Sequence, residues 1–487
     1  MRRGPLAFLV VVALASGGLA YGLLRDGDPS AGPATSTTTT TTTTTVPRAA
    51  GTPGAPGVGD PYFPDLGNGG YDVGHYTLDL TWLADEGVLD GVTTIEAAAT
   101  QDLSRFDLDL VGMDVRSISV DDRPAAYERD GRELVITPAQ GIAEGDDFTT
   151  KVTYGGRPTP VTMGTDLFAV GWQTDGREAF VVSEPAGAAT FFPVNDHPSD
   201  KATYTIRVTA PSDQTVAANG LLTAEDDSGR GTTSWTYEAR DLMASYLVQI
   251  AIGDYELVDG PAVGGVVVRH AFHRSQLDDG RVATEKTGAM VELLAEVFGP
   301  YPFEVYGVLV VDEDLGFALE TQTLTIIGSD IASQRRGADT VLLHELSHQW
   351  FGNSVSVAGW NDIWLNEGFA TYAEWIYSER TGGQTAAAIA RRAGQLGPEL
   401  DLPPGDPGPD ELFPTSVYLR GGMALQALRE AVGDEPFFEI LRTWAADHAG
   451  ATGSTEQFIA LAERVSGQDL AALFDEWLYS NTRPSLD

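Results

Sequence analysis

The chain of 487 residues contains no cysteine, which excludes disulfide bonds, thiol catalysis and cysteine-ligated zinc. Basic residues are also scarce: 30 lysines and arginines stand against 70 aspartates and glutamates, which gives a net charge of −40. A field of that sign repels nucleic acid and anionic lipid, so we expect no nucleic-acid partner. We interpret the acidity as a solvated surface rather than as a partner signal, and we infer no obligate protein partner.

An internal repeat is absent as well, and 42% of the residues are hydrophobic, so the chain is long enough for two or three domains with their own cores. In residues 1–25, Met1-Arg2-Arg3 precedes an apolar run over residues 5–24, which predicts an export signal. The run is about 20 residues long, enough to span a bilayer, so it is either cleaved or kept as an N-terminal membrane anchor. Both alternatives predict an extracytoplasmic protein.

Residues 26–59 are rich in threonine, glycine and proline, with unbroken threonine from Thr37 to Thr45. Such a composition cannot bury a core and predicts a disordered spacer. An O-glycosylated stalk is the alternative to a plain linker, and we favour the plain linker.

Residues 60–256 show a hydrophobic period of two, most clearly over residues 75–82. Alternation of this kind, punctuated by Gly, Asp and Pro turns, predicts an all-β domain whose sheets bury one face. We expect strands at residues 75–82, 106–110, 133–136, 148–154, 204–208 and 246–252.

Residues 257–487 change to mixed and then helical patterns. We expect strands at residues 266–270 and 306–311, and helices at residues 287–298, 416–432, 436–448, 455–465 and 470–479. Ser454 and Gln457 have the spacing of a capping box at the start of the helix over residues 455–465.

The segment L-H-E-L-S-H-Q-W-F-G-N, residues 343–353, contains the main candidate site. His344 and His348 lie four apart in an apolar run that predicts a helix, so both imidazoles share one face and can bind one metal ion. Glu345 lies about 100° around the helix from His344, where it can flank the metal and take a proton from water that the metal activates.

A catalytic zinc ion needs three protein ligands and one open position. Glu367, in W-L-N-E-G-F-A, follows His348 with eighteen residues between them and begins a second helical pattern. Two antiparallel helices would bring Glu367 to the two histidines. The alternative for H-E-x-x-H is a surface helix with a paired His and Glu, which the aromatic, apolar setting disfavours. We expect the remaining histidines to be structural or surface residues, namely His75, His197, His270, His273 and His448.

These two motifs resemble the zinc aminopeptidases of the aminopeptidase N and leukotriene hydrolase type, a gluzincin family, from about residue 60 to the C-terminus. The resemblance implies one zinc ion per chain, with His344, His348 and Glu367 as ligands and Glu345 as general base. It implies a saddle-like, antiparallel β domain over residues 60–256. A thermolysin-like α+β catalytic domain, mainly helical in its C-terminal half, would follow over residues 257–487.

Residues 316–323 resemble the family's G-x-M-E-N motif on an edge strand, with Leu319 and Thr321 in place of the usual Met and Asn. Glu320 falls on the glutamate that binds the free α-amine of the substrate, so the resemblance implies peptides with a free N-terminus as substrates. A substrate could add a strand beside the backbone of three residues, Gly316, Phe317 and Ala318.

Two further blocks carry the resemblance. Residues 183–193 resemble the family's Q-x-E-P segment, in which Glu184 matches the acidic residue and Val182 replaces the Gln. Two carboxylates, Glu184 and Glu320, would each give the ammonium a charge-assisted hydrogen bond. Tyr418, in Y-L-R-G, falls on the residue that donates to the oxyanion, and Arg420 stands where Lys is common.

The chain ends where the catalytic domain of this family ends, so we expect a more open cleft than in members with a C-terminal helical domain. The function expected is therefore an exported zinc aminopeptidase. A zinc endopeptidase of the same fold and an exported, non-catalytic peptide-binding protein are the alternatives.

Overall fold

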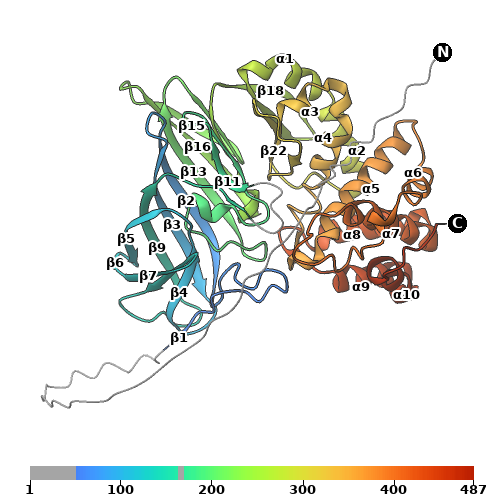
Figure 1. Ribbon diagram of the computed structural model, residues 1–487, viewed down its shortest axis with the longest axis horizontal. Coiled ribbons are helices and arrows are strands. Elements are labelled where there is room, and N and C mark those ends of the chain that lie inside the picture. The colour runs from blue at the N-terminus through green and yellow to red at the C-terminus, as the bar shows by residue number, and fades with distance from the viewer. Residues whose placement is uncertain (1–50, 163–168, 487) are drawn as a thin grey trace, which may run out of the picture.

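A computed structural model describes residues 51–162 and 169–486 of the chain (Figure 1). The segments expected as an export signal or anchor (1–25) and as most of the spacer (26–50) lie outside the described residues. The expectation of disorder is wrong for the end of the spacer, because Thr52–Pro53 form a strand that pairs with Leu103 and Arg105. None of the helices within the described ranges has the length and hydropathy that crossing a membrane requires.

The first half of the chain forms an all-β unit around an eight-stranded sheet, drawn from blue to green in Figure 1. In β2, every second residue from Tyr76 to Trp82 is buried, so the alternation in the sequence becomes one core face and one outer face. The sheet order is β15 (Leu221–Asp227), β16 (Thr232–Ala244), β13 (Lys201–Pro211), β2 (Tyr71–Leu83), β3 (Val88–Ala99), β9 (Asp147–Gly156), β5 (Asp114–Val120) and β6 (Arg123–Pro124).

Two smaller sheets complete this unit. One has the order β1 (Thr52–Pro53), β4 (Leu103–Asp109), β8 (Glu133–Thr137) and β7 (Ala126–Asp130). The other has the order β10 (Val161–Thr162), β11 (Ala169–Thr174), β12 (Ala179–Val182), β17 (Ile250–Gly253) and β14 (Thr215–Ala218). The strand expected over residues 246–252 is wrong in its first half, because residues Ser245–Leu247 form a 3-10 turn and the strand begins at Ile250. Tyr246 stacks edge-on against Trp360 instead.

The second half begins with a mixed five-stranded sheet. Its order is β18 (Tyr255–Val263), β19 (Val266–His273), β20 (Val305–Val310), β22 (Leu324–Ile327) and β21 (Ala318–Leu319), which leaves β21 at an edge. Helices lie between and after these strands, drawn from yellow through orange to red in Figure 1. They are α1 (Leu277–Ala283), α2 (Thr287–Phe298), α3 (Ser329–Ala332), α4 (Asp339–Ser347), α5 (Trp364–Arg380), α6 (Ala386–Ala393), α7 (Thr415–Val432), α8 (Asp434–Asp447), α9 (Thr455–Ser466) and α10 (Ala471–Phe474).

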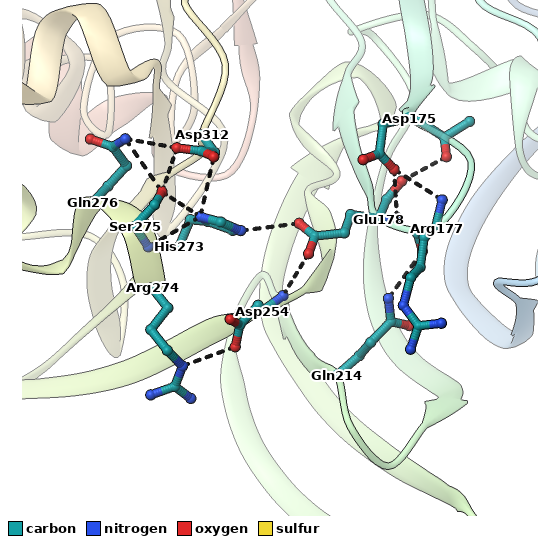
Figure 2. Close-up of polar contacts among 11 residues, drawn as sticks. Asp175, Arg177, Glu178, Gln214, Asp254, His273, Arg274, Ser275, Gln276 and Asp312 are labelled. Atoms are coloured by element: carbon teal, nitrogen blue, oxygen red, sulfur yellow. Dashed lines mark hydrogen bonds and ion pairs between the residues drawn. The ribbon is translucent and has the colours of Figure 1, made fainter.

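Polar contacts join the two halves where β17 leads into β18. Glu178, just before β12, accepts from the Asp254 N–H (3.2 Å) and faces His273 Nε2 at 3.3 Å (Figure 2). On the other side of His273, the Gln276 amide donates to Asp312 (2.7 Å).

A second join lies close to the metal motif. The buried Lys201 ammonium, from β13, donates to the carbonyls of Asn353 (2.9 Å) and Ser354 (2.8 Å). The Lys201 side chain of the β unit thus binds the backbone segment that follows the helix of the H-E-x-x-H motif.

Candidate active site

Three side chains from two helices meet in the second half of the chain. His344 lies in α4, His348 ends that helix, and Glu367 lies in the first turn of α5. One donor atom from each lies within 4.8 Å of the other two, and no other such group of His, Asp and Glu occurs among the described residues. Glu367 Oε2 is 3.1 Å from His344 Nε2 and 3.5 Å from His348 Nε2. The structure thus brings together the three residues that the spacing suggested.

The outer nitrogens of both imidazoles are already engaged. His344 Nδ1 lies 2.7 Å from Glu374 Oε1, and His348 Nδ1 donates to the Phe351 carbonyl at 3.0 Å. These bonds place a proton on Nδ1, so each Nε2 faces Glu367 and is the nitrogen available to a metal ion. Two imidazole nitrogens and a carboxylate, oriented in this way, fit the ligand set of a catalytic zinc ion.

The electrostatics of this group favour a cation. Burial acts against the charged form of Glu367, but the two histidines outweigh it and lower the pKa of Glu367 to about 2. Burial also lowers the pKa of His348, yet the Glu367 and Glu320 carboxylates outweigh it and raise that pKa to about 9. Positive charge is therefore stabilised at this point, whether a proton or a metal ion supplies it.

Glu345 and Tyr418 flank the three residues. Burial raises the pKa of Glu345 to about 8, although the neighbouring histidines oppose that shift. A carboxyl in this range can take up and return a proton near neutral pH. The Tyr418 ring lies over the His344 ring, 6.1 Å between centroids and 25° from parallel. Burial and the Glu367 carboxylate hold the pKa of Tyr418 well above its usual value, so its hydroxyl stays a donor.

A close approach of two helices brings Tyr418 to this position. A Cβ atom on Gly368 of α5 would lie 3.0 Å from the Gly421 backbone of α7, tighter than ordinary packing. The glycines that follow Glu367 and Tyr418 in their motifs therefore let α5 and α7 touch, and the two functional side chains converge from either side of the contact.

Glu184 and Glu320 approach the same region from different halves of the chain. Both are buried, and each has one carboxylate oxygen with no hydrogen-bond partner among the described residues. Burial raises the pKa of Glu184 well above its usual range, and the charged groups that add to this shift are the carboxylates of Glu320, Glu367 and Glu345. A buried acidic pair without a cation is costly, so the pair fits a ligand that brings positive charge.

The edge strand has the placement that strand addition needs. Ala318 and Leu319 pair with Ile327 and Ile326 of β22, and β21 has no other neighbour in the sheet. Gly316 is exposed with φ +74°, and Phe317 and Ala318 are half-buried. The backbone on the open side of this edge can pair with an extended peptide.

The sequence reasoning missed three residues, Glu374, Gln349 and Asn353, and left the role of Arg420 open. Glu374 lies seven positions after Glu367, which puts both on one face of α5, and this spacing could have revealed it. Gln349 and Asn353 lie inside the metal motif but donate to the Glu320 carbonyl, which only the fold shows. Arg420 is fully buried and donates to backbone carbonyls near the C-terminus, so it has a structural place away from the substrate.

Comparison with known proteins places these features in one family. The model of the peptidase M1 N-terminal domain matches residues 73–247, and the model of the peptidase family M1 domain matches residues 282–401. A crystal structure of an M1 zinc metallopeptidase from Deinococcus radiodurans is 34% identical, with a TM-score of 0.81 over 88% of this chain and 98% of that one. A mutant of that protein was solved with a Tyr-Ser-Ala substrate.

Curated relatives are longer than this chain. Aminopeptidase M1 of Arabidopsis thaliana is 27% identical over 60% of this chain and 36% of its own length. Aminopeptidase N of Streptomyces lividans is 27% identical over 82% of this chain and 49% of its own length. The chain thus spans about a third to a half of the length of these two relatives.

Proposed function

The chain belongs to peptidase family M1, whose members are zinc metallopeptidases, and from that premise we propose that it is an aminopeptidase that releases the N-terminal residue of peptides. The observation that carries the proposal is the pair of buried carboxylates, Glu184 and Glu320, beside the candidate metal ligands. An α-ammonium group could bind both through charge-assisted hydrogen bonds, and only a free N-terminus carries one. The aminopeptidase names of the relatives and the peptide bound to the Deinococcus protein support the same reading.

The proposed mechanism assigns each step to a side chain. Zinc held by His344, His348 and Glu367 would supply a Lewis acid that lowers the pKa of water and polarises a carbonyl. Glu345 takes the proton from the attacking water and later delivers it to the leaving amine. The Tyr418 hydroxyl donates a hydrogen bond to the oxygen on which negative charge develops.

The remaining groups position the peptide. Glu184 and Glu320 hold the α-ammonium, and the edge at Gly316, Phe317 and Ala318 pairs with the substrate backbone. In this proposal the clamp holds the N-terminus beside the candidate ligands, so that only the first peptide bond reaches Glu345.

A comparison of two peptides tests the proposal. An aminopeptidase should cleave a peptide with a free amine and leave its N-acetylated form intact, because acetylation removes the charge that Glu184 and Glu320 bind. Cleavage of both forms at equal rates would establish the endopeptidase alternative instead. Loss of activity with a zinc chelator, and its return with added zinc, should accompany the free-amine preference.

Glu345→Gln separates catalysis from binding. The variant should keep its zinc, because Glu345 is no ligand in this proposal, and should lose nearly all activity. Full activity in this variant would refute the assignment of the base. If the unaltered protein binds zinc and peptide but cleaves neither an aminoacyl amide nor either form of the peptide, the binding-protein alternative holds.

We further propose that the protein works outside the cytoplasm, and the support is the charged start and apolar run over residues 5–24. Cell fractionation should find it in the medium or in the membrane fraction, and the two outcomes distinguish a cleaved signal from an anchor. A cytoplasmic location would contradict this proposal and leave the enzymatic one untouched.

A further inference from the structure

Gln349 connects the metal motif to the residue proposed to bind the substrate amine. It follows His348 directly in the chain and is fully buried. Its amide nitrogen donates to the Glu320 carbonyl at 2.9 Å, and its amide oxygen accepts from the Thr323 N–H at 2.9 Å. One side chain thus holds both ends of the turn that carries Glu320.

That turn contains a strained residue. Thr323 has φ +65°, a left-handed conformation that β-branched residues rarely adopt. Two neighbours besides Gln349 hold it there: the Gly307 N–H donates to the Thr323 carbonyl (2.9 Å) and the Gly220 N–H to the Thr323 hydroxyl (2.8 Å). A conformation of this kind persists only where its surroundings impose it.

A second amide from the metal motif reaches the same carbonyl. Asn353 donates from Nδ2 to the Glu320 carbonyl at 2.7 Å, and its Oδ1 has no partner among the described residues. Gln349 and Asn353 both lie within five residues after His348, just past the end of α4. Their hydrogen bonds therefore fix the Glu320 backbone to the segment that bears two candidate ligands. The β unit contributes Asn219, which donates to the Gln322 carbonyl at 2.6 Å.

We propose that Gln349, assisted by Asn353, is a positioning residue that sets the distance between the metal ligands and the Glu320 carboxylate. The inference rests on the proposed aminopeptidase function. A buried amide that only filled the core would have no reason to bind both ends of this one turn. In this reading, Gln349 keeps Thr323 strained so that Glu320 stays aimed at the α-ammonium.

Gln349→Met tests the proposal, because methionine has a similar length and can neither donate nor accept these bonds. The KM for a free-amine aminoacyl amide should rise about tenfold, since a buried carbonyl and N–H lose their partner and Glu320 shifts. The kcat should change by less than about threefold and the zinc content should not change, because Glu345 and the ligands are untouched. Asn353→Leu should raise the KM less, because Gln349 still holds the turn.

A rescue distinguishes positioning from general stability. Thr323→Gly in the Gln349→Met background should return the KM to within about threefold of the original, because glycine adopts a positive φ without strain. Gln426→Met is the matched control. Gln426 is a buried amide between Tyr372 and Glu430, and its loss should lower stability without changing the KM.

Two results would overturn the inference: an unchanged KM in a folded, zinc-loaded Gln349→Met variant, or an equal rise in Gln426→Met. The proposed function fails separately, if the unaltered protein cleaves free and N-acetylated peptides alike. A protein that discriminates between these peptides but keeps its KM in Gln349→Met would retain the function and lose only the inference.

Discussion

At the scale of single residues, the candidate metal site depends on a carboxylate outside the ligand set. Glu374 Oε1 lies 2.7 Å from His344 Nδ1, and its side chain is 25% exposed. A carboxylate in this position fixes the tautomer and orientation of the imidazole and makes its other nitrogen a better donor to metal. Glu374 should therefore influence metal affinity without touching the ion.

Glu374→Gln tests this dependence. The amide oxygen can still accept from His344, but without the charge, so zinc affinity should fall by about 10- to 100-fold. Competition with a fluorescent chelator measures the change. Glu379→Gln, on the same helix but paired with Arg429, should bind zinc like the unaltered protein. Equal affinities in the two variants would show that the contact to His344 is inconsequential.

A buried carboxyl in the β unit makes stability depend on pH. Glu133 of β8 lies opposite Asp109 of β4. Burial raises the pKa of Glu133 to about 8, and the Asp109 carboxylate adds to the shift, while Arg132 opposes it. The folded state holds this proton more tightly than the unfolded chain, whose pKa is near 4.5. The stability that the neutral Glu133 carboxyl gives the folded state is therefore fully present below about pH 4.5 and is lost as the pH rises through about 8.

Glu133→Gln should remove this loss of stability at high pH. The variant should melt near the unaltered protein at pH 5 and several degrees above it at pH 8.5, because the amide never acquires a charge in the buried site. Thermal melts at the two pH values provide the measurement, with the exposed Glu128→Gln as control. A parallel fall of both melting temperatures between pH 5 and 8.5 would argue against Glu133 as the source.

Local spacing explains which site residues could be predicted. The helical repeat brings His344 and His348 together, so the sequence alone suggests the pair. Gln349 lies in the same motif, yet its role depends on a turn that begins 29 positions earlier in the chain. No periodicity reports such a contact, since it follows from how a strand edge packs on a helix end.

At the scale of elements, α7 is fastened to the end of the chain by one guanidinium. Arg420 donates to five backbone carbonyls, those of Leu400, Asp401, Glu476, Trp477 and Ser480. A planar group with five donors can reach carbonyls that diverge in this way, whereas an ammonium with three cannot. The bonds fix the start of α7, where Tyr418 lies two residues before Arg420.

Arg420→Met tests how much these hydrogen bonds contribute to the stability of the fold. Several buried carbonyls would lose their donor, so the free energy of unfolding should fall by on the order of 3 kcal/mol. Urea unfolding gives the value, and Arg464→Met, which breaks an exposed pair with Asp447, should cost about 1 kcal/mol or less. Equal losses would place Arg420 among ordinary surface charges.

Helices were predicted more accurately than the strand beside the join of the two halves. The helix expected over residues 287–298 is α2 to the residue, and the Ser454–Gln457 capping box forms as expected. These signals are local, since period and cap lie within one segment. The segment 246–252 is apolar apart from Gln249, and Tyr246 at its start packs against Trp360 in the second half of the chain, a contact that no local pattern encodes.

At the scale of the whole molecule, the proposed substrate clamp spans both halves of the chain. Glu184 comes from the β unit and Glu320 from the catalytic half, so their relation depends on the joins between the halves. The Glu178–His273 network in Figure 2 is partly exposed, with 31% and 12% of the two side chains accessible, and is screened by solvent. The Lys201 contacts are buried, so we expect them to carry more of the coupling.

Zinc removal should reveal this coupling. A ligand that binds only the folded state stabilises it by about 3–4 kcal/mol when its free concentration is 100- to 1,000-fold above Kd. Zinc would join α4 to α5, both in the catalytic half, so removal by a chelator weakens that half directly. If the halves unfold as one unit, calorimetry should show a single transition that moves down by a few degrees.

Lys201→Met should separate the two halves. The carbonyls of Asn353 and Ser354 lose their donor, which makes the join less favourable by about 1–3 kcal/mol. Burial lowers the pKa of Lys201 to about 7, so the comparison belongs at pH 6, where the ammonium is charged. In this variant, calorimetry with the chelator should show two transitions, because the β unit no longer unfolds together with the half that has lost its zinc. Two transitions in the chelated, unaltered protein would instead mean that Lys201 couples nothing.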